Sequence, residues 1–227
     1  MARATAVIAA AGSGVRLGAG GPKALVELAG RSLIEWSLDA CVAAEEVAAV
    51  VVAAPPAMVG DFEAALGSCP LPLQVVAGGE TRSGSVAAAL ASVESEISVV
   101  HDAARPLATA ALFDAVVREL GAAPERDCVL AATPVTDTVK EVEGREVVRT
   151  LDRSRLWAAQ TPQAFRTEAL RRALAAGPLT HATDDAMLVE ALGGRVAVHE
   201  GPPQNIKVTA QADLRTAALL LAERNRG

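Results

Sequence analysis

The sequence predicts an α/β fold in which a mainly parallel sheet is flanked by helices. Short apolar runs alternate along the chain with segments whose apolar residues recur every three or four positions, a pattern typical of βαβ units. The chain has 227 residues, 51% of them hydrophobic, which is enough to bury a core as one domain. A loop crowded with glycines directly follows the first apolar run.

In the first half of the chain, strands and helices are predicted in strict alternation. Ser32 and Glu35 have the spacing of a capping box at the start of the first helix. The second strand ends at Pro55, because proline cannot donate to a strand ladder. The predicted strands are 4–10, 47–54, 73–79 and 97–106, and the predicted helices are 32–44, 57–66 and 80–93.

The second half continues this alternation with one interruption. Thr109 is the predicted N-cap of a helix over 111–120, and residues 211–225 predict an amphipathic closing helix. Between them the sequence predicts strands over 128–135 and 195–201 and helices over 167–175 and 184–192.

The interruption is residues 136–153, which predict a two-stranded hairpin turning at Glu143-Gly144. Both faces of this hairpin are too polar for the core, so we expect a projecting β-arm. A two-stranded arm is marginally stable alone. It is either a solvated surface hairpin or packs against a second subunit, and we favour the latter, in a homodimer.

The composition of the chain indicates which kinds of binding partner and which cellular compartment to expect. The net charge of −6 argues against nucleic acid as a partner. No apolar run is long enough to span a membrane, and we interpret "TAVIAAAG" as a first strand rather than a signal peptide. The three cysteines, Cys41, Cys69 and Cys128, lack C-x-x-C spacing and indicate reduced thiols in a cytoplasmic protein.

The loop "AAAGSGVRLGAGGPKAL" (residues 9–25) carries Arg16 and Lys23 and lies where open parallel sheets bind ligands. Its G-x-G-x-x-x-G pattern is one residue longer than the dinucleotide fingerprint, and no acidic residue ends the second strand, which disfavours a nicotinamide dehydrogenase. Lys23 is followed by Ala24 rather than Ser or Thr, which disfavours a Walker A loop. The sequence therefore predicts another phosphate site, with a passive connector as the alternative.

The scarcity of lysine strengthens this interpretation. Only three of the 21 basic residues are lysines, at positions 23, 140 and 207. A coding bias toward arginine explains the surface. A lysine retained against that bias indicates a site that needs a compact ammonium group.

The motif "HDAARP" (residues 101–106) places Asp102 directly after an apolar strand. One carboxylate together with phosphate oxygens commonly holds Mg²⁺, so Asp102 is the candidate metal ligand. The alternative is that Asp102 caps a turn and His101 is a core histidine. No two histidines have metal-ligand spacing, and none is assigned to a metal.

Taken together, these motifs resemble those of the 2-C-methyl-D-erythritol 4-phosphate cytidylyltransferases. The matching segments occur in the family's order over nearly the whole chain: "AAAGSGVRLG…GPK", "GGETRSGSV", "VVHDAARP", "PVTDTVK", "LDRSRLWAAQTPQAF", "TDDA" and "NIKVT". Ala104 favours this family over the ribitol-phosphate enzymes, which tend to carry a bulkier residue there. Ala24 and Gln204 depart from the family pattern, which puts any contact at Gln204 in doubt.

The resemblance implies a single, Rossmann-like nucleotidyltransferase domain over residues 1–227 with a mixed sheet. It implies transfer of a cytidylyl group from CTP to methylerythritol phosphate with release of pyrophosphate and with Mg²⁺ as cofactor. A ribitol-phosphate or other sugar-phosphate cytidylyltransferase and a non-catalytic nucleotide-binding module are the alternatives. The acceptor phosphate is already ionised, so no general base is required.

The resemblance also implies roles for individual residues. For Arg153, the alternative to the roles given below is a surface ion pair with Asp152 or Glu146. Lys140 is left unassigned. The implied catalytic residues are Arg16, Lys23, Arg153 and Lys207. The implied nucleotide-binding residues are Ala10, Ala11, Gly12, Gly79, Glu80, Arg82, Ser85 and Asp102. The implied acceptor-binding residues are Arg105, Thr138, Arg153 and Thr161.

Overall fold

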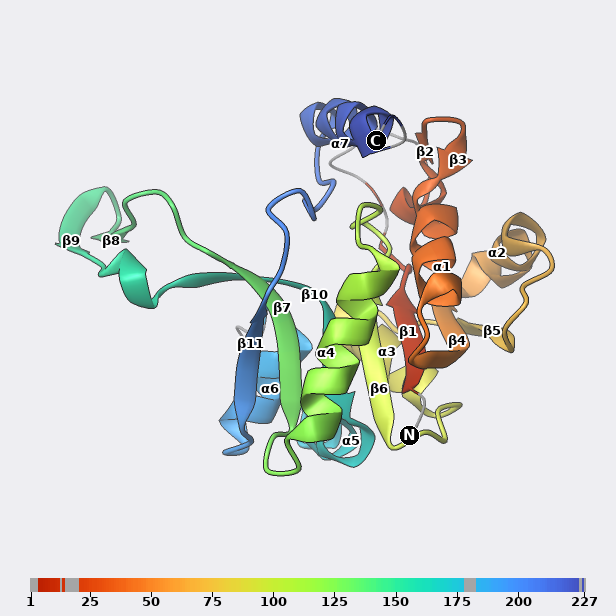
Figure 1. The fold of residues 1–227 in the computed structure, drawn as a ribbon, viewed down its shortest axis with the longest axis horizontal. Coiled ribbons are helices and arrows are strands. Elements are labelled where there is room, and N and C mark those ends of the chain that lie inside the picture. The colour runs from red at the N-terminus through yellow and green to blue at the C-terminus, as the bar shows by residue number, and fades with distance from the viewer. Residues whose placement is uncertain (1–3, 13, 15–20, 178–182, 225, 227) are drawn as a thin grey trace.

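A computed structural model describes residues 4–12, 14, 21–177, 183–224 and 226. Within these residues seven strands form one sheet in the order β11-β7-β10-β6-β1-β4-β5 (Figure 1). Neighbouring strands are parallel except around β10, which is antiparallel to both β6 and β7. The predicted mainly parallel, mixed sheet is confirmed. The strands are β1 (Ala4–Ala9), β4 (Val47–Ala54), β5 (Leu73–Ala77), β6 (Ile97–Asp102), β7 (Cys128–Pro134), β10 (Trp157–Arg166) and β11 (Val196–Glu200).

The helices lie close to their predicted positions. Ser32 and Glu35 form the predicted capping box, and the Thr109 side chain accepts from the Leu112 amide at the start of α4. The α-helices are α1 (Leu33–Ala43), α2 (Val59–Leu66), α3 (Arg82–Leu90), α4 (Ala110–Ala122), α5 (Thr167–Ala175), α6 (Asp185–Ala191) and α7 (Gln211–Arg224). Shorter elements are the 3₁₀ turns η2 (Lys23–Leu25), η3 (Pro56–Met58) and η4 (Arg153–Arg155) and the ribbon of β2 (Glu27–Leu28) and β3 (Arg31–Ser32).

Alternating side chains of the strands bury both faces of the sheet. Ile8 of β1 belongs to a cluster with buried residues of α1, α2 and α4, whereas Val7 belongs to a cluster with residues of α3, α5 and α6. A smaller cluster seats α7 through Ala217 and Leu221 against Leu33 at the start of α1. The result is a three-layer α/β arrangement with helices on both faces (Figure 1).

Strand β10 is the member of the seven-stranded sheet that local sequence patterns did not predict. Its sequence "WAAQTPQAFR" is poor in β-branched residues and has a proline in its interior, which argues against a central strand. The register shifts between Ala159 and Gln163, so Pro162 lies at an irregularity of the ladder rather than in regular pairing. Gln160 is buried and its Oε1 accepts from the Asn205 side chain at 2.9 Å. Tertiary hydrogen bonds thus replace the missing apolar pattern.

The predicted β-arm is present as the pair β8 (Lys140–Glu143) and β9 (Glu146–Thr150). Gly144 turns the hairpin at φ 61°, a left-handed conformation that favours glycine. The arm projects away from the sheet (Figure 1), and its residues are exposed. Val142, Val147 and Val148 each expose more than half of their surface on it, at 51, 58 and 53%. Such exposed β-branched side chains are typical of a surface that another chain covers.

The structure also bears on the predictions about membrane spans and cysteines. In the portion of the chain that the structure describes, no helix combines the length and apolar character needed to cross a membrane. All three cysteines are free thiols, and burial raises the pKa of Cys41 and of Cys128 well above the ordinary value.

The strand order creates a crevice at one edge of the sheet. From β1 the chain passes to β4 and β5 on one side, and then returns to β6 on the other side of β1. The connections from β1 and from β6 therefore leave in opposite directions at adjacent carboxyl ends. In open α/β sheets ligands bind at such a switch point.

Candidate active site

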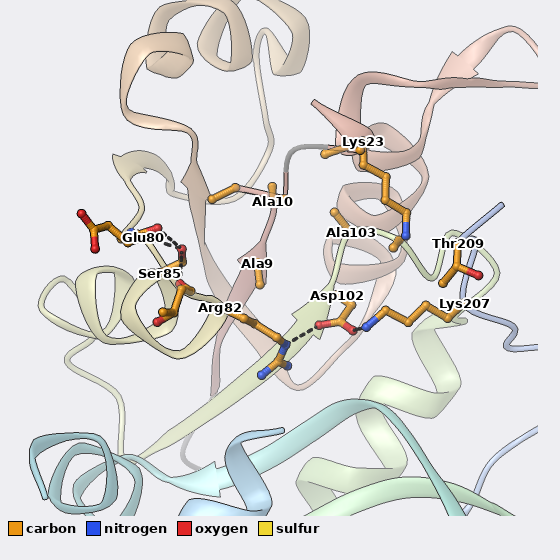
Figure 2. Close-up of a pocket in the computed structure, with 17 residues that line it drawn as sticks. Ala9, Ala10, Lys23, Glu80, Arg82, Ser85, Asp102, Ala103, Lys207 and Thr209 are labelled. Atoms are coloured by element: carbon orange, nitrogen blue, oxygen red, sulfur yellow. Dashed lines mark hydrogen bonds and ion pairs between the residues drawn. The ribbon is translucent and has the colours of Figure 1, made fainter. Parts of the chain in front are cut away.

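A pocket of about 460 Å³ lies at the carboxyl ends of β1 and β6, within the size range of small-molecule sites. All eight predicted nucleotide-binding residues line it, together with Lys23 and Lys207 (Figure 2). Ala104, Thr81 and Thr209 also line it. Thr81 and Thr209 belong to the motifs "GGETRSGSV" and "NIKVT", but no individual role was predicted for them. The lining residues are Ala9, Ala10, Ala11, Gly12, Gly14, Lys23, Ala24, Gly79, Glu80, Thr81, Arg82, Ser85, Asp102, Ala103, Ala104, Lys207 and Thr209.

The described ends of the glycine-rich loop are tied together beside β1. The Lys23 amide donates to the Gly12 carbonyl at 3.1 Å. Gly14 has φ 69°, and a Cβ there would lie 2.8 Å from the Gly21 carbonyl oxygen, so only glycine fits. Lys23 extends into the pocket toward the segment that carries Lys207 (Figure 2). The predicted catalytic Arg16 lies outside the described residues.

A second wall is the turn that leads into α3. The Thr81 side chain accepts from the Gly84 amide at 2.9 Å and caps the helix. The Ser85 hydroxyl accepts from the Gly79 amide at 3.2 Å and lies 2.9 Å from the Thr81 carbonyl oxygen, to which it donates. A Cβ on Gly79 would lie 2.8 Å from the Gly84 carbonyl carbon. Ser85 therefore holds the backbone of this wall in place.

Asp102 lies at the centre of the pocket floor, paired with two cations (Figure 2). Its Oδ1 accepts from Arg82 Nε at 2.9 Å and its Oδ2 from Lys207 Nζ at 2.5 Å. Burial alone would raise the pKa of Asp102, but the charges and hydrogen bonds of Arg82 and Lys207 hold that pKa well below its ordinary value. Asp102 is therefore a carboxylate throughout the neutral range.

Arg82 also contacts a second carboxylate, Asp185 of α6. Arg82 Nη1 lies 2.5 Å from Asp185 Oδ2, and the Asp185 side chain has no exposed surface. Burial raises the pKa of Asp185, and the Arg82 charge opposes that rise. No role for Asp185 was predicted from the sequence. The only signal was its place in the motif "TDDA".

Behind Asp102, buried polar side chains form a network around Thr161. The Asp102 amide donates to Thr161 Oγ1 at 3.0 Å, and His101 Nδ1 lies 3.1 Å from the same oxygen. His101 Nε2 lies 3.2 Å from the Arg105 carbonyl oxygen. Since a carbonyl only accepts, Nε2 carries the hydrogen and Nδ1 accepts from the Thr161 hydroxyl. Burial lowers the pKa of His101 to about 4, so its ring is neutral. The alternative of His101 as a core histidine thus matches its place in the structure.

The predicted acceptor-binding residues lie outside the pocket lining. Thr161 is buried, and its hydroxyl both donates and accepts within the network, which gives it a positioning role toward Asp102. Arg105 donates from Nη1 to the Asn205 carbonyl at 2.7 Å and from Nη2 to the Ala159 carbonyl at 3.2 Å. The side chains of Thr161 and Arg105 thus bond to other groups of their own chain. These bonds do not support the prediction that either residue contacts the acceptor directly.

Thr138 and Arg153 lie at the base of the β-arm and are exposed. The Arg153 guanidinium donates to the Thr136 carbonyl. Among the described residues it forms no salt bridge with Asp152 or Glu146, the alternative that the sequence left open. The structure thus does not bring these two residues into the pocket of their own chain.

The described residues do not form a complete cage for a metal ion. No group of three or more histidine, cysteine or acidic side chains lies together among them. Asp102 uses one acceptor position on each oxygen for a cation, and each carboxylate oxygen has two such positions. The donor set therefore fits an Mg²⁺ ion that arrives with a nucleotide and takes most of its ligands from phosphates and water.

Comparison with known proteins agrees with this geometry. The family model of 2-C-methyl-D-erythritol 4-phosphate cytidylyltransferase matches residues 4–223. The chain belongs to this family. It is 44% identical over 227 residues to the 2-C-methyl-D-erythritol 4-phosphate cytidylyltransferase of Synechococcus sp. (strain CC9902), covering 96% of this chain and 97% of that protein. It is 45% identical to the enzyme of the same description from Saccharopolyspora erythraea, covering 96% and 98%.

A bifunctional relative and two solved structures also match this chain. The bifunctional enzyme IspD/IspF of Clavibacter michiganensis is 46% identical over 223 residues, and the chain spans 54% of its length. Among solved structures, the 4-diphosphocytidyl-2C-methyl-D-erythritol synthase of Anaerococcus prevotii has a TM-score of 0.85 at 28% identity, covering 97% of this chain and 96% of that chain. The cytidylyltransferase of Thermus thermophilus has a TM-score of 0.75 at 35% identity, covering 97% and 99%. The single α/β domain of this chain thus has the same fold as the solved structures of this family.

Proposed function

We propose that this chain transfers the cytidylyl group of CTP to 2-C-methyl-D-erythritol 4-phosphate, forming 4-diphosphocytidyl-2-C-methyl-D-erythritol and pyrophosphate. The reaction is that of the family to which the chain belongs. The observation that carries it is the convergence of Lys23, Arg82 and Lys207 on one pocket at the switch point of the sheet.

Positive charge in the pocket suits this reaction because the substrates repel each other. The acceptor phosphate attacks the α-phosphorus of CTP, and negative charge gathers on the departing pyrophosphate. Such a reaction needs positioning and preorganised cations more than a base. The carboxylate of Asp102 is paired on both oxygens, and His101 is buried with both ring nitrogens engaged. Neither group is placed to act as a general base.

Lys207 and Lys23 are the two lysines that line the pocket. The Lys207 side chain is 40% exposed and reaches the pocket floor from the segment preceding α7. The Val208 amide donates to the Ala104 carbonyl at 2.8 Å, which fixes that segment beside β6. We assign Lys207 to the attacking phosphate, and Lys23, with Arg16 of the same loop, to the α-phosphate and the leaving pyrophosphate.

The cytosine base and the metal ion have separate places in this proposal. The backbone of Ala10 to Gly12 and of Gly79 to Glu80 would read the edge of the base, with Ser85 keeping that backbone in position. Asp102 would hold Mg²⁺. When bound, that ion would neutralise charge on the phosphates of CTP.

The β-arm supplies the acceptor site if two chains pair. Within one chain, Thr138 and Arg153 flank the strand pair β8–β9 and do not line the pocket. Its exposed valines favour contact with a second copy, and two-fold pairing would bring each arm to the partner's pocket. We therefore propose a homodimer in which each acceptor site combines one body with the other chain's arm.

The buried free thiols support the cytoplasmic location proposed from the sequence.

Pyrophosphate release from CTP, Mg²⁺ and methylerythritol phosphate tests the function. The parent should turn over, and K23A should lose roughly 10²–10³-fold in kcat, because one preorganised charge at the phosphates is gone. Arg215→Ala on exposed α7 removes a cation outside the pocket and serves as the control. Ribitol phosphate in place of the acceptor tests the sibling activity. CTP binding without turnover on any acceptor would instead indicate a binding module.

Mixing two inactive variants tests the shared site. In a heterodimer of K23A with R153A, one site carries both substitutions and the other carries neither. Random mixing should therefore restore about a quarter of the parental activity. No recovery, from variants shown by light scattering to exchange subunits, would contradict the arm assignment.

A further inference from the structure

We propose that Asp185 is a positioning residue of this site, which fixes the guanidinium of Arg82 and, through Arg82, orients Asp102. The inference deepens the cytidylyl transfer proposed above and rests on it. Asp185 has no exposed side-chain surface and is not among the pocket-lining residues. It can therefore influence a ligand only through the side chain that it holds.

The contact joins two helix starts that are far apart in sequence. Arg82 is the first residue of α3 and Asp185 the first residue of α6, 103 positions later. A guanidinium is planar with fixed donor directions, so anchoring Nη1 on Asp185 determines where Nε points. In the structure Nε points at Asp102 Oδ1 at 2.9 Å (Figure 2).

The four side chains form a row of alternating charge across the pocket floor: Asp185, Arg82, Asp102 and Lys207. The row is electrically neutral. An incoming acceptor phosphate attracts both cations, and Lys207 is the more exposed of the two, at 40% against 27% for Arg82. Because Asp185 holds Arg82 from behind, Arg82 keeps its bond to Asp102 while Lys207 can turn to the phosphate.

The burial of Asp185 argues against a purely structural role. Among the described residues its Oδ1 has no hydrogen-bond partner, although the atom is buried. An unsatisfied buried carboxylate oxygen costs stability, and an apolar pair of similar volume would often serve the fold better. Positioning of Arg82 explains why a carboxylate is kept at residue 185 despite its cost to stability.

Steady-state kinetics of matched variants test the assignment. Asp185→Asn should lower kcat by roughly 10- to 100-fold, the loss typical when the residues that orient a metal ligand, here the candidate ligand Asp102, are disturbed. Asp184→Asn is the same change one residue away and should stay within about two-fold. Asp184 accepts from the Met187 amide at 3.0 Å as the N-cap of α6 and from the Gln163 side chain at 2.9 Å; asparagine can keep the cap, and neither contact involves Arg82. Equal effects of the two substitutions would overturn the proposal.

A double-variant cycle separates positioning from general destabilisation. If Asp185 acts through Arg82, the double variant R82Q/D185N should be no less active than R82Q, because no guanidinium remains to be positioned. The double variant also removes the Asp185 charge that R82Q alone would leave buried without its arginine, so it should fold even where R82Q alone does not. Losses in kcat that multiply would overturn the proposal.

The failure of this inference can be told apart from that of the proposed function. A parent that does not turn over defeats the function. The same cycle is then measured as CTP dissociation constants by calorimetry, where non-additivity supports the Arg82–Asp185 coupling and additivity overturns it.

Discussion

The neutral, buried His101 gives a testable dependence of stability on pH. Its pKa of about 4 in the folded chain lies below the value of about 6.5 for a free imidazole. Between these values the unfolded chain binds a proton at this position and the folded chain does not. The free energy of unfolding therefore falls as the pH falls through this window.

The size of the effect follows from the difference between the two pKa values. A difference of about 2.5 units corresponds to about 3.4 kcal/mol, present above pH 6.5 and lost on acidification to pH 4. Between pH 6.5 and 5, where fewer carboxylates titrate, the loss is about 1.6 kcal/mol. At a urea m-value of about 2 kcal/mol/M, the midpoint of unfolding should move by about 0.8 M.

Urea unfolding followed by fluorescence of Trp36 and Trp157 measures this dependence. In His101→Gln the residue stays neutral, so the slope between pH 5 and 6.5 should fall by about 1 kcal/mol per pH unit. The absolute stability of the variant will also fall, because the ring packs on Phe113 with centroids 5.0 Å apart, so slopes are compared. His199→Gln at the sheet edge leaves the His101 network intact and should keep the His101 contribution. Equal slopes in the parent and in His101→Gln would refute the reasoning.

Three further outcomes are expected. Lys207→Ala should lower kcat by roughly 10²–10³-fold, because a cation for the attacking phosphate is lost; an unchanged pyrophosphate-release rate would contradict this. Gly79→Ala should destabilise the fold by about 1–3 kcal/mol in urea titrations and raise the KM for CTP, because its Cβ would lie 2.8 Å from the Gly84 backbone; wild-type values for both would show that the wall can yield. Val147→Asp should shift a dimer toward monomer in light scattering and lower turnover; a dimer that persists would place the interface elsewhere.

The sequence predicted the parts of the fold in which local pattern and tertiary placement agree. The strands β1 and β6 carry continuous apolar runs, and their ends carry the glycine-rich loop and Asp102, so the position of the pocket could be predicted. The hairpin could be predicted because its alternation and Gly144 are local signals.

What could not be predicted depends on contacts between distant segments. Strand β10 lacks a strand-like composition. Its two buried glutamines form hydrogen bonds with distant side chains, Gln160 with Asn205 and Gln163 with Asp184. The pairing of Arg82 with Asp185 joins two helices whose proximity is a property of the whole sheet order. In the proposed dimer the place of the arm residues relative to a pocket depends on a second chain, which no pattern within one chain describes.

The antiparallel strand β10 has a mechanical consequence. It pairs with β7 from Trp157 at the foot of the arm and, further along, passes Thr161, whose hydroxyl accepts from the Asp102 amide. Strand β10 thus connects the foot of the arm to the residue that contacts the Asp102 backbone. Only Trp157 to Ala159 pair regularly with β7 before the ladder becomes irregular. Because side chains alternate along a regular strand, deleting one residue of that stretch would turn the foot of the arm over, whereas deleting two would keep its facing.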